Sequence, residues 1–369
     1  MKTADVIVIG GGIAGASAAA EIAAAGAQVL LLEMESQPGY HATGRSAAMY
    51  EPCEGIALVR ALTRASYGFF SSPPDGFVDV ALLSPRGVLM LGYEGDERLI
   101  VDAKRNGFAE VDAGFARSKL PLVKLDGVIA ILWDGQAQDI DVDALHAGRL
   151  RALRRAKGEA VADAAVRRGE RIRNAWRLEA DGETYEAPMI VVAAGAWSDQ
   201  VATSCGLAPI GLQPKRRSAA VLAGPAGASV ADWPEISPVD VNFYAKPMGG
   251  KLMLSPADED PVQPHDAWAD DLRLAEAAAG LERCVDMQVQ RFERTWGGLR
   301  TFAPDGLPVV GFDPAADGFF WLAGQGGYGI QTSPALSRLA AALLAGREIP
   351  ADLTREGVSQ EQLSPRRFR

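Results

Sequence analysis

Closely spaced glycines near the N-terminus, followed by one carboxylate, have the types and spacing needed to hold a nucleotide. The glycines stand in the run Gly10-Gly11-Gly12-Ile13-Ala14-Gly15. In such a run the first glycine permits a tight turn, the second lets backbone approach a pyrophosphate, and the third lets a helix pack closely on a strand. Glu33 follows 18 residues after Gly15, near the spacing at which a carboxylate meets ribose hydroxyls. A carboxylate there disfavours a 2′-phosphate, and therefore NADP, and leaves FAD and NAD as candidate ligands.

The elements that would position these residues form one strand–helix–strand unit. Residues 6–9 are a β-branched apolar run, typical of a strand buried on both faces. Residues 16–25 are rich in strong helix formers, and Gly26 ends the predicted helix. Residues 29–32 predict a second buried strand that closes at Glu33. The helix N-terminus would then direct unpaired N–H groups and the positive end of its dipole at the phosphates.

A second segment distinguishes FAD from NAD. The residues Thr43-Gly44-Arg45-Ser46 come shortly after the second predicted strand and are followed by Ala47 and Ala48. Gly44 permits close backbone approach, Arg45 and the two hydroxyls offer donors to phosphate, and the alanines leave room beside a flat ring. This pattern resembles that of the D-amino acid oxidase superfamily of flavoproteins, in which the stretch passes between the pyrophosphate and the flavin ring. The resemblance implies FAD as the cofactor.

The resemblance recurs along the chain. Residues 139–145 resemble the family segment that opens a helix into the cofactor domain, and residues 190–197 resemble the strand and turn that return to the cofactor. Residues 324–332 resemble the segment that meets the ribityl chain and the pyrimidine end of the flavin. The cofactor-binding residues that the resemblance implies are Gly10, Gly12, Ile13, Ala14, Gly15, Glu33, Thr43, Gly44, Arg45, Ser46, Ala47, Ala48, Val166, Ala194, Gly195, Trp197, Gly298, Arg300, Gly326, Gly327, Tyr328, Gly329, Ile330, Gln331 and Thr332. Sarcosine-oxidase relatives carry a cysteine in the C-terminal flavin region. Because no cysteine follows Cys284 here, we expect the FAD to be non-covalent.

Because the cofactor motifs are dispersed, the FAD-binding domain must be discontinuous. We predict an α/β fold with a Rossmann-like FAD-binding domain over residues 1–80, 139–210 and 296–369. A second, mostly antiparallel β-sheet domain over residues 81–138 and 211–295 would bind the substrate above the flavin. Within these domains the patterns predict strands at residues 218–222, 242–246 and 251–254, a helix over residues 144–156, and another starting near Pro334.

An amino acid oxidised by a flavin needs a counterion for its carboxylate, and arginine suits this because its planar fork pairs with both oxygens. By matching positions, the resemblance implies four substrate-contacting residues: Arg217, Tyr244, Arg300 and Gly327. The arginines and the tyrosine hydroxyl would meet the carboxylate, and the Gly327 carbonyl would accept from the amine. The alternatives are a structural ion pair for Arg300, a solvent-facing basic run for Arg217 and a core position for Tyr244.

Within the superfamily, the chain resembles the bacterial D-arginine dehydrogenases at residues 37–41, 82–86, 212–218, 295–300 and 325–332. The residues expected around the substrate side chain differ from those of that family. The pocket positions that differ are Met49, Glu54, Val88, Glu235 and Ser237. Val88 stands where those relatives have the acid that meets the distal guanidinium. Two interpretations stay open. Glu54 and Glu235 replace the lost carboxylate and select a cationic side chain, or Met49 and Val88 select an apolar one.

The expected reaction is the FAD-dependent oxidative deamination of a D-amino acid. Hydride would pass from Cα to flavin N5, and the imino acid would hydrolyse to a 2-oxo acid and ammonia. A different substrate on the same fold is the main alternative: a secondary amine of the sarcosine, proline or glycine type, or a 2-hydroxy acid with His41 as its only candidate base. A flavin-bound, non-catalytic subunit is a third. Oxygen and a quinone both remain open as electron acceptor.

Composition excludes several other classes. Among 369 residues, 37 Lys and Arg face 47 Asp and Glu, and the resulting net charge of −10 disfavours nucleic acid and anionic lipid as partners. No stretch of 18 apolar residues is unbroken, so no membrane span is expected. Three widely spaced cysteines and three scattered histidines suggest neither disulfides, nor a metal site, nor a Ser-His-Asp triad. We therefore expect a cytoplasmic enzyme that acts on a small-molecule amino acid.

Overall fold

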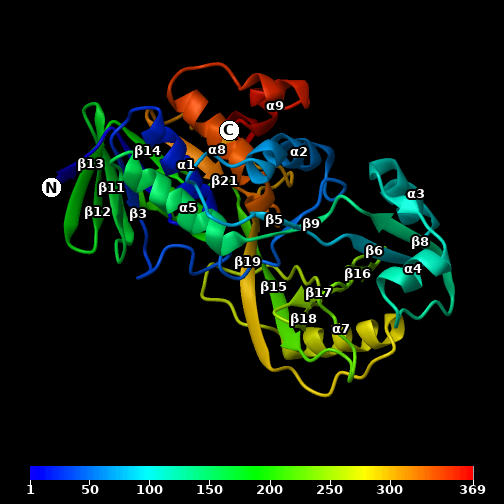
Figure 1. Ribbon diagram of the computed structural model, residues 1–369. Helices are drawn as coiled ribbons and strands as arrows, with labels where there is room; N and C mark the ends of the chain where they lie inside the picture. The colour runs from blue at the N-terminus through cyan, green and yellow to red at the C-terminus, as the bar shows by residue number, and fades with distance from the viewer. Residues whose placement is uncertain (369) are drawn as a thin grey trace.

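The computed structural model describes residues 1–368 and contains two layered units (Figure 1). The first is built on a six-stranded sheet with the order β10-β3-β2-β14-β21-β20. Its strands are β2 (Val6–Ile9), β3 (Val29–Leu32), β10 (Glu159–Val161), β14 (Met189–Val192), β20 (Val309–Phe312) and β21 (Phe319–Ala323). Neighbouring strands are parallel except for β20 with β21. This is a Rossmann-like sheet with one antiparallel edge strand.

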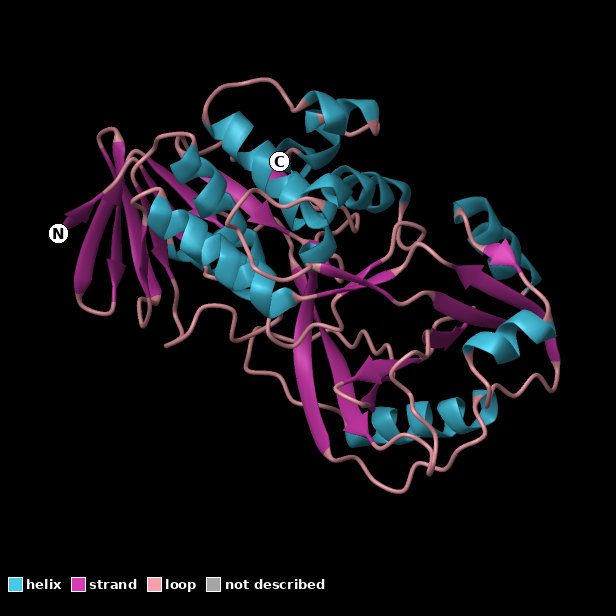
Figure 2. Cartoon of the chain, viewed as in Figure 1, coloured by secondary structure: helices cyan, strands magenta, loops and turns pink. Residues whose placement is uncertain are grey.

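Both faces of the six-stranded sheet are covered, which explains why its strands are apolar throughout. In β2, Val6 and Val8 face one core, whereas Ile7 and Ile9 face the other. The first core is shared with the helices α1 (Ile13–Ala24), α2 (Ala57–Ser71), α5 (Val142–Arg155) and α8 (Gly329–Leu344). The second is shared with a four-stranded sheet of β1 (Lys2–Thr3), β13 (Glu183–Ala187), β12 (Ala175–Ala180) and β11 (Val166–Ile172). Figure 2 shows this sheet and the helices on opposite sides of the parallel strands.

The second unit is a nine-stranded sheet with the order β22-β19-β15-β18-β17-β16-β6-β8-β7. Its strands are β6 (Val88–Tyr93), β7 (Ala109–Glu110), β8 (Val128–Asp134), β15 (Gln213–Leu222), β16 (Glu235–Pro238), β17 (Tyr244–Met248), β18 (Lys251–Ser255), β19 (Arg294–Phe302) and β22 (Gln325–Gly326). The sheet is antiparallel apart from the pair of β16 with β6. Helix α7 (Asp271–Cys284) packs on one face through an apolar core. The other face turns toward the first unit.

Short elements connect and cap the two units. A three-stranded sheet of β4 (Met49–Tyr50), β9 (Gln138–Ile140) and β5 (Leu83–Pro85) joins segments that enter and leave the second unit. The remaining elements are α3 (Glu97–Asn106), α4 (Ala113–Lys119), η1 (Gly195–Trp197), α6 (Ser198–Ser204), α9 (Ala351–Arg355), α10 (Gln360–Leu363) and η2 (Pro365–Phe368). No helix within residues 1–368 is long and apolar enough to cross a lipid bilayer.

The predicted fold class is confirmed, and two of its details need correction. The strand–helix–strand unit and the strands near residues 218, 244 and 252 are present. The predicted boundary at residue 296 falls inside β19, which pairs with β15 along Arg294–Phe302, so residues 296–302 join the second sheet. The helix expected near Pro334 begins at Gly329 instead, and Pro334 lies inside it. The helix tolerates this proline because the carbonyl of Ile330, which has no proline N–H to accept from, accepts from the Ser333 hydroxyl at 2.9 Å.

Candidate active site

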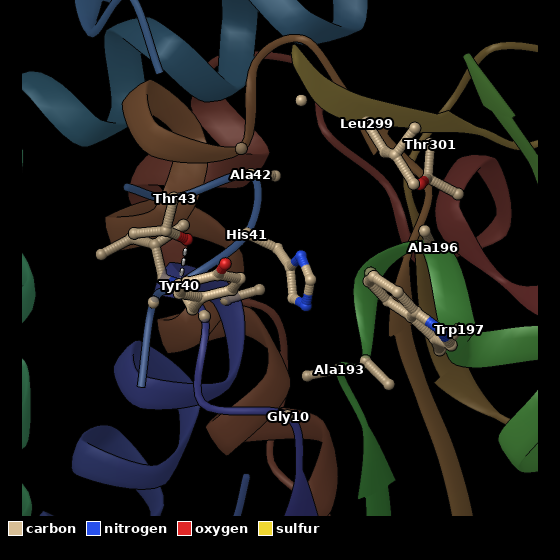
Figure 3. A pocket seen from close by; sticks show the side chains of 18 of the residues that line it. Gly10, Tyr40, His41, Ala42, Thr43, Ala193, Ala196, Trp197, Leu299 and Thr301 are labelled. Atoms are coloured by element: carbon tan, nitrogen blue, oxygen red, sulfur yellow. Dashed lines mark hydrogen bonds between the residues drawn. The ribbon is translucent and has the colours of Figure 1, made fainter. Parts of the chain in front are cut away.

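One cavity between the two units collects residues from all the cofactor motifs. The six-stranded sheet contributes residues from the segments 9–14, 32–34 and 193–201, and the nine-stranded sheet contributes Arg217, Tyr244 and the segment 298–301. Figure 3 shows the rings of His41 and Trp197 facing each other in it, with centroids 4.5 Å apart. The cavity therefore runs from the carboxyl ends of the parallel strands to the open face of the second sheet.

The glycine-rich turn brings bare backbone and a helix N-terminus to this cavity. Gly10 has a φ of 106°, and a Cβ on Gly15 would stand 1.9 Å from the Gly10 carbonyl oxygen. Gly12, the N-cap of α1, offers no side chain, while the N–H of Ile13 donates to Thr43 Oγ1 at 2.9 Å. The positive end of α1 thus opens onto the cavity, which suits a pyrophosphate.

Glu33 is fixed at the end of β3, where it also lines the cavity. Its side chain accepts from the N–H of Gly11 at 2.6 Å and from the N–H of Glu35 at 2.9 Å. His146 on α5 holds the same turn from the other side, with Nε2 2.8 Å from the Gly11 carbonyl oxygen. Burial lowers the pKa of His146, because it disfavours the charged imidazole.

The guanidinium of Arg45, the expected phosphate donor, hydrogen-bonds to other parts of the protein. Its Nη1 donates to the carbonyls of Ala267 (3.0 Å) and Gly297 (2.9 Å), and its Nη2 donates to Asp266 at 2.5 Å. We name residues 258–270 the strap; this segment pairs with β15 through Lys215 and Pro261. Arg45 therefore ties the cofactor loop to the strap while it lines the cavity, and the hydroxyls of Thr43 and Ser46, which accept from backbone N–H groups, keep their own O–H donors.

Most other predicted cofactor residues line the cavity. They are Val166, Ala194, Gly195, Trp197, Gly298, Arg300, Gly326, Gly327, Gly329 and Ile330, with Ser46 and Ala47 from the cofactor loop. The rest, Gly15, Gly44, Ala48, Tyr328, Gln331 and Thr332, do not line it and support its walls. Gln331 is buried, and its Oε1 accepts from the N–H of Glu51 at 2.8 Å. Thr332 Oγ1 donates to the Tyr328 carbonyl at 2.7 Å, so this end of the motif builds the helix start.

The residues present fit FAD. The start of α8 reaches the cavity at Gly329 and Ile330, and its N-cap Tyr328 makes no side-chain capping bond. The N-termini of α1 and α8 therefore meet one cavity without a cap from their own N-cap side chains, and both favour negative charge. When bound there, FAD would supply the two-electron chemistry, while the chain supplies binding and orientation.

One face of the nine-stranded sheet carries the predicted substrate residues. Arg217 lies opposite Gly298, two residues before Arg300, and Ile236 lies opposite Ala245. Because side chains alternate along a strand, the residues flanking Ile236 share a face with those flanking Ala245. Glu235, Ser237 and Tyr244 therefore point to the same side as the arginines, toward the cofactor unit.

Arg300, Tyr244 and Arg217 meet at the end of the cavity. Arg300 Nη2 donates to the Tyr244 hydroxyl at 3.4 Å, and a Cβ on Gly327 would stand 2.5 Å from Arg300 Nη1. Arg217 Nη2 donates to Glu259 at 3.0 Å, whereas its buried Nε has no partner within residues 1–368. Burial and the nearby Arg300 lower the pKa of Arg217. Two guanidiniums with free donors form a ready site for a carboxylate.

Three carboxyl groups, Glu51, Glu54 and Glu235, lie beside this site, and we call them the acidic trio. Burial raises the pKa of each, and mutual repulsion adds to the shift for Glu51 and Glu235. The pKa of Glu235 rises to about 7, although Lys246 opposes the shift. Arg300 opposes it for Glu54. A positive group entering here would relieve the repulsion.

Met49 and Val88 do not line the cavity, and neither do the members of the trio. Met49 and Val88 are 7% and 1% exposed and pack with Met90, Ile100 and Leu132 in an apolar cluster. Ser237 is also buried, and its Oγ has no partner within the described residues. Of the five predicted pocket residues, Met49 and Val88 thus lie among core side chains, whereas Glu54 and Glu235 lie close enough to Arg300 to interact with its charge.

Sequence reasoning missed three residues of the site: Glu51, Lys246 and Glu259. Lys246 Nζ lies 2.5 Å from Asp139 and donates to the Ala47 carbonyl at 2.7 Å, beside the cofactor loop. Its position two residues after Tyr244 in one strand could have revealed it. Glu51 lies inside the segment that Met49 and Glu54 delimit. No local pattern marks Glu259, which reaches Arg217 from the strap.

The comparison with protein-family models identifies the class. Residues 5–343 match the family described as FAD dependent oxidoreductase, so the chain belongs to that family, and FAD is its cofactor. The two-unit fold and the cavity described above are those of an FAD-dependent oxidoreductase.

Individual proteins resemble the chain along nearly its whole length. The glycine oxidase of Pseudomonas aeruginosa is 26% identical over 372 residues, which cover 93% of this chain and 95% of that protein. The crystal structure of L-proline dehydrogenase from P. horikoshii superposes with a TM-score of 0.84 at 19% identity, covering 100% of this chain and 98% of the other. Iminodiacetate oxidase from Chelativorans sp. BNC1 gives a TM-score of 0.75 at 23% identity, with 98% of each chain covered.

Proposed function

We propose that this protein uses FAD to oxidise a D-amino acid to its 2-oxo acid and ammonia. The observation that carries the proposal is the convergence of Arg300, Tyr244 and Arg217 at the end of the FAD cavity. An arginine fork with a phenol beside it matches the carboxylate common to all α-amino acids.

The chain's own residues would bind and orient the substrate. Arg300 and Tyr244 would hold the carboxylate, and the Gly327 carbonyl would accept from the neutral amine, so that the Cα hydrogen faces the cofactor. Burial of the site excludes water and strengthens these contacts. The hydride of Cα would pass to the FAD with both electrons of its bond, while the nitrogen lone pair would form the C=N bond of the protonated imine, and water would then hydrolyse the released imino acid to the 2-oxo acid and ammonia.

A cation entering the acidic trio would favour the ionised form of carboxyls whose pKa burial raises, so a positively charged substrate side chain fits this site. Glu54 and Glu235 are close enough to Arg300 for their charges to interact, whereas Met49 and Val88 pack in the core. This arrangement favours a substrate with a cationic side chain, as the resemblance to D-arginine dehydrogenases suggested. The carboxylates would come from Glu54 and Glu235 and not from the position that Val88 occupies. D-Lysine should therefore be a better substrate than D-norleucine, which has the same chain without the charge.

A secondary or simple amine is the second candidate. The proteins that resemble this chain include a glycine oxidase, an L-proline dehydrogenase and an iminodiacetate oxidase. Each of those substrates carries an amine beside a carboxylate, which the same arginines would hold. A 2-hydroxy acid is less well served, because His41 Nε2 is paired with Glu35 at 2.8 Å and its ring packs on Trp197.

Anaerobic bleaching of the bound flavin tests the proposal. The holoenzyme is mixed with D- and L-amino acids, glycine, sarcosine, proline and 2-hydroxy acids, and the flavin absorbance is followed. We expect D-amino acids to reduce the flavin and L-enantiomers to leave it oxidised. Reduction by sarcosine or proline alone would replace the proposal with the second candidate. Reoxidation by air or by a soluble quinone then identifies the electron acceptor.

A further inference from the structure

Glu259, on the strap, places a carboxylate on the substrate-binding arginine pair. Its Oε1 accepts from Arg217 Nη2 at 3.0 Å, and its Oε2 lies 2.9 Å from Lys215 Nζ. Partial burial would raise the pKa of Glu259, but Lys215, Arg217 and Arg300 together lower it. Glu259 is therefore ionised at neutral pH.

Within the carboxylate site, Glu259 is the carboxylate that pairs directly with Arg217. Arg217 and Arg300 lie close enough for Arg300 to lower the pKa of Arg217. One substrate carboxylate neutralises only one of the two guanidiniums, and a buried unpaired charge is unfavourable. Glu259, whose side chain is 42% exposed, supplies a negative charge to Arg217 from the strap.

The contact with Glu259 occupies one N–H group of Arg217 and leaves others available. Its Nη2 is taken by Glu259, while its buried Nε has no partner within residues 1–368. Of the five N–H donors of the guanidinium, Glu259 thus takes one, and Nε is among those left for a ligand in the cavity that Arg217 lines with Arg300. A second carboxylate on a ligand would have to displace Glu259 to reach the guanidinium fully.

We propose that Glu259 is a specificity-determining residue, a counterion supplied by the strap that limits the site to substrates with a single carboxylate and rejects dicarboxylic ones. This inference rests on the carboxylate-binding role proposed above for Arg300 and Arg217. It assigns Glu259 to selection between substrates, and not to the oxidation itself.

The test compares two ligands of equal length, butyrate and succinate, which differ only in a methyl group replaced by a carboxylate. Binding to the holoenzyme is measured by calorimetry and by the change in flavin absorbance. In Glu259→Gln, we expect the affinity for succinate relative to butyrate to rise at least tenfold over the wild type. Asp260→Asn is the matched control, because Asp260 is the next residue of the strap and pairs with Arg216, away from the cavity. It should change the ratio less than twofold.

Two results would overturn the inference. One is an unchanged ratio in Glu259→Gln, and the other is an equal rise in both variants, which would indicate only the general loss of negative charge. Arg300→Met separates this outcome from a failure of the proposed function. If Arg300→Met weakens butyrate binding while Glu259→Gln leaves the ratio unchanged, the carboxylate site stands and the role of Glu259 does not.

Discussion

Arg300 owes its position to neighbours on three different elements. Tyr244 on β17 accepts from it, Gly327 after β22 leaves room for its guanidinium, and Arg217 on β15 lies beside it. A larger residue at 327 would displace the fork, and loss of the phenol would free it to rotate. The geometry of the fork, and not only its charge, should therefore matter to the reaction.

Replacing Arg300 with lysine tests this view. Arg300→Lys keeps the positive charge but loses the planar pair of donors, so we expect kcat/KM to fall about 10- to 100-fold, in line with the ~1.5–3 kcal/mol of a charged hydrogen bond. Steady-state kinetics with the best substrate of the bleaching panel measures the change. Flavin content should stay at the wild-type level. Unchanged kcat/KM in the lysine variant would contradict a bidentate role.

The raised pKa of Glu235 predicts a pH-dependent stability. The folded protein holds a proton on Glu235 up to about pH 7, whereas the unfolded chain releases it near the ordinary glutamate pKa of 4.5. Between these values the folded state binds more protons, so this group's contribution to the free energy of unfolding falls as pH rises.

Glu235→Gln removes that titration. We expect the stability of the variant relative to wild type to increase by about 2–3 kcal/mol between pH 5 and pH 8, since one pKa unit corresponds to ~1.4 kcal/mol. Urea unfolding of both holoproteins at the two pH values, followed by tryptophan fluorescence, measures it. A difference that is independent of pH would show that Glu235 titrates normally.

The residues of the site were predictable to different degrees. Glu33 followed from the spacing of a known nucleotide-binding unit, and Arg300 from a family resemblance. Arg45 was predicted as a phosphate donor from its type, and its additional contacts with the strap could not be predicted, because only the tertiary structure brings those acceptors near. Glu259 could not be predicted, because its contact with Arg217 depends on how the strap lies along β15.

At the scale of elements, the strand–helix–strand unit depends on close contact between α1 and the turn before it. Gly15→Ala would place a Cβ 1.9 Å from the Gly10 carbonyl oxygen and 3.3 Å from Ala193 Cβ, so the helix must move away from β2. We expect the purified variant to hold less than a tenth of the wild-type FAD. The ratio of flavin to protein absorbance measures this. Gly68→Ala is a control in α2 of the same unit, where a Cβ would meet nothing within 4 Å; full loss of flavin there too would point to general misfolding.

Local patterns predicted the strands but not their partners. The alternating segments at β15, β17 and β18 were recognised because one face of each is apolar. The parallel pair of β16 with β6 joins segments from distant parts of the chain. Side chains of both strands pack in one core with α7, and no local pattern carries the information that sets their register.

At the scale of the whole molecule, Arg45 connects the two units across the cofactor cavity. It joins the cofactor loop of the first unit to the strap and to Gly297 in β19. We expect Arg45→Met to raise the dissociation constant of FAD at least tenfold, because three hydrogen bonds that hold the loop are lost. Flavin fluorescence on dilution of the holoprotein measures the release. Asp260→Asn, a strap variant that leaves Arg45 intact, should retain FAD; equal retention by Arg45→Met would contradict the role.

The interleaving of the two units limits how this protein can be recombined with its relatives. β6 enters the nine-stranded sheet early in the chain and pairs with β16 much later, while β4 and β9 bracket that first excursion. A chimera that takes residues 81–138 from one parent and residues 211–295 from another would pair β6 and β16 from different proteins, and their side chains would not be matched for packing. Productive crossovers should therefore exchange both excursions at once, so substrate preference is expected to be inherited through pairs of separated gene segments.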